Sequence, residues 1–393
     1  MKGRSDSTKP RILYISRSRG YGGSSIAAIR CAAAFSETHD VSLLAIQESE
    51  GERFRDHARH FGLNATTATT LGAVMALLPM LYRRFDLIHL HSGHYLITPK
   101  TALLNRLARF RGVPLVVSLH GPVLPYQARH ARARAFHAAH FDNIGAVTLM
   151  SDTEAAFHIE QGIPRSGLMV IPPIMREQPP ALGNRAEFDI PENATTLLFA
   201  GRIVQHKGVT ELIKAFQDLP ERHGNTVLII AGDGPGIDEA KALAQGTPNV
   251  RFLGWIEMME LERLYPLVDL CVFPSHTESF GMVAVEAGVA GTPMLVSRIE
   301  PWTDMFEPDV DCGFFEAGDA PGITKAITTA LDQPERARQR ATHLQKKLST
   351  LYSKETVARM YEQAYARAQQ SKGSAFDRHR RNRRSVSRDT TDH

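Results

Sequence analysis

The stretch PSHTESFGMVAVEAGVAGTP, residues 274–293, carries the clearest fold signal in the chain. It begins at the end of the apolar run LCVFPS, which is typical of a buried strand, and changes to a helical pattern in VAVEAGVA. Glu278 lies in the loop before that helix, and Glu286 lies inside it among apolar residues. Burying a carboxylate is costly unless hydrogen-bond donors satisfy it. Two interpretations follow for Glu286: it accepts from vicinal hydroxyls such as those of a ribose, or it lies on a wet face of the helix.

The same alternation of strand and helix extends outward through both halves of the chain. Short apolar runs rich in branched residues occupy residues 11–16, 41–46, 85–91, 114–120 and 145–151, and then 195–202, 226–234, 249–254, 270–275 and 293–297. Continuous apolar runs suit parallel strands that helices cover on both faces. We therefore predict an α/β protein with two doubly wound, Rossmann-like domains facing each other across a cleft, and ligands outside the carboxyl ends of the strands.

Composition shifts set the expected boundaries. The 393 residues suffice for two cores. We expect a disordered N-terminus, a first Rossmann-like domain, a proline-rich linker, a second Rossmann-like domain, a final helix and a basic disordered tail, at residues 1–10, 11–175, 176–194, 195–353, 354–370 and 371–393.

The net charge of +4 is distributed unevenly along the chain, with about +8 in residues 1–180, −8 in residues 181–370 and +4 in the rest. No apolar run approaches signal-peptide or membrane-spanning length, so we expect a cytoplasmic protein. Cys31, Cys271 and Cys312 form no CxxC pair, which argues against a disulfide framework or a cysteine-rich zinc site.

Three loops after predicted strands have the residue types that bind phosphate. Gly20, Gly22 and Gly23 precede a helix start, where free amides and the helix dipole attract anions, although a flexible turn is an equal alternative. Arg202 and Lys207 share a second loop and together offer the two positive charges that a pyrophosphate needs, whereas single loop cations are usually solvated. In the third loop, AGDGPG, we expect a structural turn and no ligand role for Asp233.

Taken together, these motifs resemble a retaining glycosyltransferase of family 4 with the GT-B fold. Four elements occur in the family's order: the Gly22-Gly23 loop, the G-R-x4-K-G segment at 201–208, the G-D-G-P turn at 232–235, and the E-x7-E element from Glu278 to Glu286. The resemblance covers about residues 11–369 and is much stronger in the second domain. It implies that the first domain binds the acceptor and that the second binds the nucleotide sugar.

The resemblance implies a role for each matching residue. Arg202 and Lys207 would bind the donor diphosphate, and Glu286 would bind the ribose. Glu278 and the backbone amides of the next residues would contact the transferred sugar and distal phosphate; these residues are Ser279, Phe280, Gly281 and Met282. The loop with Gly22 and Gly23 would close on the phosphates, and His120 would touch the donor sugar. The catalytic set would be Glu278, His120, Arg202 and Lys207, with no metal.

Two segments depart from the family pattern. Pro173-Ile174 stands where Asn-Gly is usual, and Glu300-Pro301 with Asp304 replaces a Gly-Gly and Glu loop. A strand-end histidine such as His120 is also often structural, and its neighbours His89, His91 and His94 look like a metal cluster with weaker claims.

The expected activity is that of a retaining hexosyltransferase, which moves a sugar from a nucleotide-diphosphate sugar to an acceptor hydroxyl. A nucleotide-sugar epimerase on the same fold, or a noncatalytic nucleotide- or nucleic-acid-binding protein, is the alternative. The tail motif HRRNRR lacks interleaved aromatic residues, so we do not expect nucleic acid as a partner.

The acceptor is a glycan, a lipid or a small molecule, and the candidate acceptor segments are Ala65–Leu81 and Pro122–His140. Arg129, Arg132 and Arg134 could form one basic helix face. That face would meet an anionic membrane, such as the inner face of the plasma membrane, or would simply be solvated.

Overall fold

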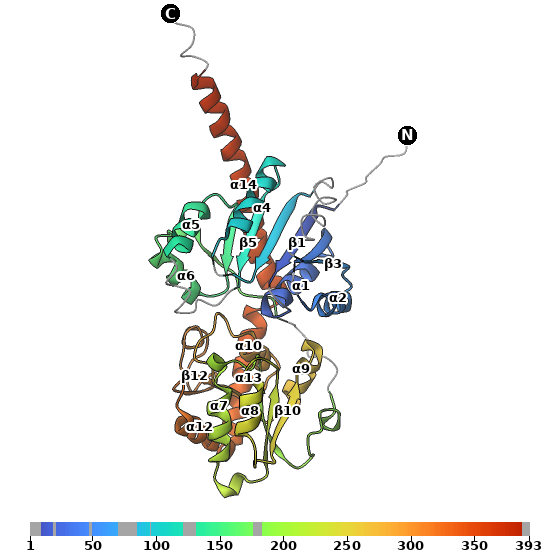
Figure 1. Cartoon of the computed structure of the whole chain (residues 1–393), viewed down its shortest axis with the longest axis vertical. Helices are drawn as coiled ribbons and strands as arrows, with labels where there is room; N and C mark the ends of the chain where they lie inside the picture. The colour runs from blue at the N-terminus through green and yellow to red at the C-terminus, as the bar shows by residue number, and fades with distance from the viewer. Residues whose placement is uncertain are drawn as a thin grey trace, which may run out of the picture. The chain divides into compact units, whose positions relative to one another are not determined.

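The structure is a computed structural model that describes residues 9–18, 21–46, 49–69, 85–94, 96–120, 131–175 and 183–386, with side chains up to residue 370. The chain divides into two compact units (Figure 1). The first contains Met1–Ile174 and Glu355–His393, and the second contains Met175–Lys354. The final helix therefore belongs with the first unit.

The first unit is built on a parallel sheet of seven strands in the order β3-β2-β1-β4-β5-β6-β7. The strands are β1 (Arg11–Arg17), β2 (Asp40–Ile46), β3 (Ala65–Ala68), β4 (Leu87–Ser92), β5 (Leu115–Leu119), β6 (Ala146–Leu149) and β7 (Met169–Val170). The five strands expected here are confirmed. The short edge strands β3 and β7 escaped sequence analysis because ATTA and MV are too short and too weakly apolar to form a pattern.

Helices cover both faces of this sheet (Figure 1). They are α1 (Gly23–Phe35), α2 (Gly51–His60), α4 (Pro99–Phe110), α5 (Ala131–Phe141), α6 (Asp152–Glu160) and α14 (Lys354–Val386). Alternate residues of β1 point to opposite sides, so that Leu13 and Ile15 enter a core with α4, α5 and α6, while Tyr14 meets Tyr365 of α14. Burial on both faces explains the continuous apolar runs.

Helix α14 extends beyond the end expected from the sequence. It continues from Lys354 to Val386 and so enters the segment 371–393, for which we expected no ordered structure. The segment contains no proline and is rich in arginine, a good helix former, so a helix that is anchored in the core can propagate into it.

The second unit repeats the architecture with six parallel strands in the order β10-β9-β8-β11-β12-β13. The strands are β8 (Thr195–Ala200), β9 (Thr226–Ala231), β10 (Val250–Gly254), β11 (Leu270–Phe273), β12 (Met294–Ser297) and β13 (Gly313–Phe315). All five expected strands are confirmed, and β13 is an edge strand of three residues that no pattern indicated.

The helices of the second unit are α7 (Val209–Gln217), α8 (Ile237–Leu243), α9 (Met258–Leu264), α10 (Met282–Val289), α11 (Trp302–Met305), α12 (Ala320–Asp332) and α13 (Pro334–Leu351). Its core packs α7, α8 and α12 against Leu197, Phe199 and their neighbours on one face of the sheet. Helix α10 packs against α13, where an added Cβ at Gly288 would lie 2.6 Å from Leu348. Close helix packing therefore explains the glycine inside an apolar helix.

Residues 176–182 of the expected linker lie outside the described residues, and residues 183–194 include a short 3₁₀ helix, Arg185–Phe188. The three cysteines are buried and free. Among the described helices, none combines the length and apolar character needed to cross a membrane.

Candidate donor-binding site

Three of the predicted donor ligands lie in loops that follow neighbouring strands at the centre of the second sheet. Strands β8 and β11 are adjacent and parallel, although α7, β9 and further elements separate them in sequence. This is the topological switch point, where loops after neighbouring strands diverge to opposite faces and leave a crevice. Arg202 follows β8, Lys207 ends the 3₁₀ helix Gln205–Lys207 before α7, and Glu278 follows β11.

Lys207 and Glu278 form an ion pair across this point. The Nζ atom of Lys207 lies 2.5 Å from Oε1 of Glu278, with the side chains 18% and 9% exposed. The hydroxyl of buried Ser275 also donates to that oxygen, at 2.9 Å. A partly buried carboxylate is thus held by one cation and one hydroxyl. The sequence placed both charged residues in the site but did not predict that they would pair with each other.

Backbone contacts fix the loops that carry these groups. The N–H of His276 donates to the carbonyl of His206 at 2.8 Å and so joins the loop after β11 to the loop after β8. The N–H of Ile203 donates to the carbonyl of Asp233 at 2.9 Å, and an added Cβ at Gly234 would lie 2.4 Å from the carbonyl oxygen of Ile203. The structural role expected for the G-D-G-P turn is confirmed, because the turn supports the loop of Arg202.

Two glycines have backbone shapes that other residues rarely adopt. Gly208 has a φ of 68°, and an added Cβ would lie 2.1 Å from the carbonyl oxygen of Pro274. Gly281 has a φ of 80°, and its added Cβ would lie 2.3 Å from Nε1 of Trp302. Each glycine lets two strand-end loops approach closely.

The start of α10 supplies backbone donors beside Glu278. Gly281 precedes the helix, and Met282 is its first residue, so the first amides have no carbonyl acceptor within the helix. Phe280 is buried and packs edge-on against Tyr352, with ring centroids 5.6 Å apart. The four residues expected to contact the sugar and distal phosphate therefore lie with Glu278 in the turn that leads into α10.

Glu286 lies one to two turns further along α10 and is 8% exposed. Its neighbours Ala284, Val285 and Ala287 are fully buried. The burial contradicts the interpretation that places Glu286 on a wet helix face. A buried carboxylate needs hydrogen-bond donors, which keeps the ribose role open as a prediction.

The candidate residues of the first unit follow β1 and β5. Gly22 has an extended backbone and precedes Gly23, the first residue of α1; their partner Gly20 lies outside the described residues. His120 follows β5 and is 9% exposed, with Nε2 2.9 Å from Nδ1 of His91 and Nδ1 3.1 Å from the Met150 sulfur. Burial lowers the pKa of His120 to about 4, so its imidazole is neutral near pH 7.

Behind His120, a buried polar network ties α14 to the sheet. Nδ1 of His89 lies 3.0 Å from the Tyr365 hydroxyl, and its Nε2 lies 2.8 Å from the Ser118 hydroxyl. Cys31, His89 and His91 each bring one potential metal-ligand atom within 4.8 Å of the others. Both nitrogens of His89 have hydrogen-bond partners, whereas the buried Nε2 of His91 has none among the described residues.

Three further groups near the site were missed by sequence reasoning. Ser275 orients Glu278, His276 pairs with Glu211 of α7 at 3.2 Å, and the fully buried Trp302 packs behind Gly281. Burial and the neighbouring Lys207 lower the pKa of His206. The signal for Ser275 was its position directly after a strand, beside a carboxylate, whereas no local pattern marks the others.

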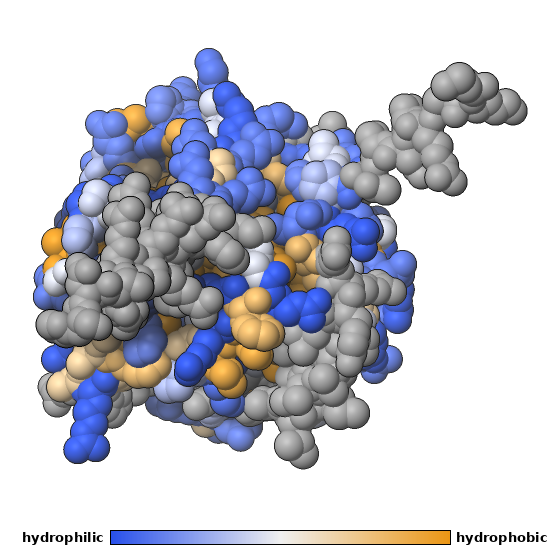
Figure 2. All heavy atoms as spheres, turned by 90° about the horizontal axis from the view of Figure 1, so that it is seen from above, coloured by the Kyte–Doolittle hydropathy of each residue, from blue (hydrophilic) through white to orange (hydrophobic). Residues whose placement is uncertain are grey.

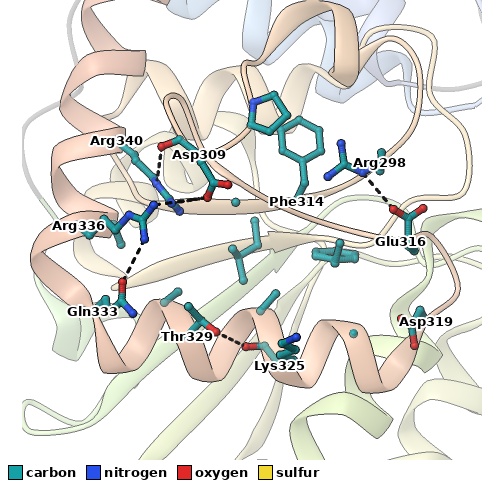
Figure 3. A pocket seen from close by; sticks show the side chains of 18 residues that line it. Arg298, Asp309, Phe314, Glu316, Asp319, Lys325, Thr329, Gln333, Arg336 and Arg340 are labelled. Carbon is teal, nitrogen blue, oxygen red and sulfur yellow. Dashed lines mark hydrogen bonds and ion pairs between the residues drawn. The ribbon is translucent and has the colours of Figure 1, made fainter.

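A separate cavity of about 440 Å³ lies at the β13 edge of this unit, between the sheet and helices α12 and α13 (Figure 3). None of the predicted donor ligands lines it. Four of its charged groups pair with one another, Arg298 with Glu316 at 3.0 Å and Arg340 with Asp309 at 2.5 Å. The cavity is therefore a weaker candidate than the switch point.

The described part of residues 122–140 contradicts the prediction of one basic helix face. Arg132 and Arg134 lie on α5, two positions and hence about 200° apart around the helix, so they do not share a face. Arg129, the remainder of Pro122–His140 up to residue 130, and residues 70–81 of the other acceptor segment lie outside the described residues.

Each unit matches a known family model. Residues 22–173 match the family "Glycosyl transferase 4-like domain", and residues 183–347 match "Glycosyl transferases group 1". The chain is 35% identical over 179 residues to glycogen synthase of Mycobacterium tuberculosis, an alignment that covers 44% of this chain and 42% of that protein. It is 27% identical over 228 residues to the lipopolysaccharide core biosynthesis glycosyltransferase LpsD of Rhizobium meliloti, covering 57% and 64%.

The fold is also that of solved structures. Anabaena HepE in complex with UDP-glucose superposes with a TM-score of 0.76 at 19% identity, over 91% of this chain and 99% of that one. The two parallel-sheet, Rossmann-like domains are thus those of the GT-B fold, as the sequence predicted. The chain aligns with only about two fifths of the length of the mycobacterial synthase.

Proposed function

We propose that this chain, which contains a glycosyl transferase 4-like domain followed by a glycosyl transferases group 1 domain, is a retaining glycosyltransferase. It would move a sugar from a nucleotide-diphosphate donor to an acceptor hydroxyl. The observation that carries the proposal is the Lys207–Glu278 pair at the switch point, beside the start of α10 and within the group 1 domain. The UDP-glucose bound by Anabaena HepE supports a UDP-sugar donor.

In this proposal, cations and amides hold the donor. Arg202 and Lys207 bind the diphosphate, Glu286 accepts from the ribose hydroxyls, and Glu278 accepts from the sugar. The amides of the turn from Ser279 to Met282 contact the sugar and distal phosphate. Gly22, Gly23 and His120 stay predictions for the donor phosphates and sugar. The imidazole of His120 is neutral, and a contact with the sugar would replace its contact with His91 or Met150.

The proposed step breaks the bond between the anomeric carbon and the diphosphate oxygen. The acceptor hydroxyl forms its new bond from the same face, and its proton passes to the departing diphosphate oxygen, so the configuration is retained. Arg202, Lys207 and the helix-start amides stabilise the negative charge that develops on the leaving group. Two fixed cations can perform this electrostatic task, and we propose that the enzyme needs no metal.

The acceptor belongs to the same proposal. A glycan, lipid or small-molecule hydroxyl would react, and the similarity to LpsD, whose name specifies lipopolysaccharide core biosynthesis, supports a glycan or glycolipid.

The test combines donor binding with product analysis. Purified protein is screened by thermal shift against a panel of nucleotide sugars and is then incubated with the radiolabelled form of each stabilising donor. Slow release of free sugar supports a transferase, an epimer supports an epimerase, and oligonucleotide binding without turnover supports a noncatalytic protein. NMR of the transferred anomeric centre decides between retention and inversion, and turnover after chelation tests metal independence.

Site variants complete the test. Lys207→Ala and Glu286→Ala should each lower donor turnover, since one removes a phosphate contact and the other a ribose contact. Lys241→Ala on the exposed side of α8 is the matched control, because it removes the same charge away from the site. Unchanged turnover in both site variants would disprove the site assignment.

A further inference from the structure

Helix α4 turns an apolar stripe toward solvent. Leu103, Leu107 and Phe110 are 58%, 42% and 88% exposed, which places three of the chain's large exposed hydrophobic side chains on this one helix. Their spacing of four and three residues aligns them along one face. Figure 2 shows the molecule from above, with hydrophobic side chains reaching the surface among hydrophilic ones.

The opposite face of α4 anchors the helix, so the stripe cannot turn inward. Thr101, Asn105 and Ala108 are buried, and Ala108 belongs to the core of the first unit. The Asn105 side-chain amide donates to the carbonyl of Asn143 at 2.9 Å, and the Thr98 side chain caps the helix start. The orientation of the helix is fixed by these contacts and by the sheet beneath it.

Positive charges border the stripe on both sides. At about 100° per residue, Lys100 and Arg111 lie along one edge of the stripe and Arg106 lies along the other. All three side chains are exposed, and they make no ion pair with any residue that the structure describes. The segment from Pro99 to Arg111 contains no aspartate or glutamate.

We propose that the exposed face of α4 docks on an anionic lipid surface. The two leucines and the phenylalanine would enter the boundary between headgroups and acyl chains, while Lys100, Arg106 and Arg111 contact lipid phosphates. A second copy of the chain is a poor occupant, because two identical cationic faces repel. The proposal holds whatever reaction the enzyme catalyses, and it replaces the α5 face as the membrane-facing element.

Vesicle flotation tests the proposal on the full chain. Wild-type protein should float with vesicles of equal parts phosphatidylglycerol and phosphatidylcholine. Its affinity for vesicles of pure phosphatidylcholine should be lower by about tenfold or more. The triple variant L103Q/L107Q/F110Q should lose about tenfold or more in affinity for the anionic vesicles. The control Ile159→Gln, an exposed hydrophobic position of α6 that is 44% exposed, should bind like wild type.

A second variant separates insertion from surface attraction. In Phe110→Trp, the new indole should be quenched by brominated phosphatidylcholine mixed into the anionic vesicles, compared with the parent tryptophans Trp255 and Trp302. The double variant R106Q/R111Q should weaken binding by about fivefold per charge. If the triple variant bound the anionic vesicles with wild-type affinity, the proposal would be overturned, because another part of the chain would then hold the lipid. Failure of the wild type to float, or self-association through α4, would overturn it as well.

Discussion

Replacing Glu278 by glutamine should affect donor binding and catalysis in opposite directions. In the free protein, the carboxylate holds Lys207 at 2.5 Å and accepts from Ser275. A donor diphosphate must share or remove that lysine and must also approach a negative charge. Glu278→Gln keeps the size and the acceptor oxygen but removes the charge, so we expect UDP to bind more tightly and sugar transfer to slow.

The structure sets the size of the effect. Two unit charges about 4 Å apart interact by about 4 kcal/mol at an effective dielectric constant of about 20. The 18% exposure of Lys207 and the Ser275 hydroxyl reduce what the diphosphate regains. We therefore expect about 1 to 2 kcal/mol, or about five- to thirtyfold tighter UDP binding. Turnover should fall by about tenfold or more, because the sugar loses a charged acceptor.

Isothermal titration with UDP and a turnover assay with the sugar donor make the two measurements. Glu239→Gln is the control, since this exposed residue of α8 gives the same change in net charge away from the switch point. Weaker UDP binding in Glu278→Gln would refute the competition between carboxylate and diphosphate. Unchanged turnover would instead refute the role of Glu278 toward the sugar.

Three further results are expected. Gly281→Ala should lower the free energy of unfolding in urea by about 2 to 4 kcal/mol, because the left-handed backbone and the contact with Trp302 both oppose a Cβ. The control is Gly246→Ala, where φ is 81° and the space around the added Cβ is open, and it should lower the free energy of unfolding by only about 1 kcal/mol. Gly22→Ala has an extended backbone and no atom within 4 Å of its Cβ, so the thermal midpoint should stay unchanged while donor turnover falls; a lower midpoint would contradict this. Burial lowers the pKa of His158 to about 3, so the unfolded chain binds more protons and the free energy of unfolding should fall from about pH 6.5 to pH 4. His158→Gln should make this fall shallower in urea titrations, and an equal slope would show that other groups dominate.

Local sequence was sufficient wherever one segment carries its own signal. Apolar runs of strand length predicted ten strands, because strands buried on both faces must be apolar throughout. Glu286 was identified within one helix, since a carboxylate in an otherwise apolar helix is an anomaly that can be seen in the local sequence. The short edge strands gave no such signal because they contain too few residues to form a pattern. The full length of α14 gave none because contacts with residues distant in sequence anchor the helix.

The sequence by itself determined the α/β class, the two repeated units and the residue types that cluster after the strands. Only the tertiary structure decided that Lys207 pairs with Glu278, that Glu286 is buried, and that Leu103, Leu107 and Phe110 face solvent. The physical reason is that pairing and burial depend on which strands lie side by side. Strands β8 and β11 are neighbours in the sheet although many residues separate them in sequence. The periodicity of a helix such as α4 does not show which of its faces packs on the sheet.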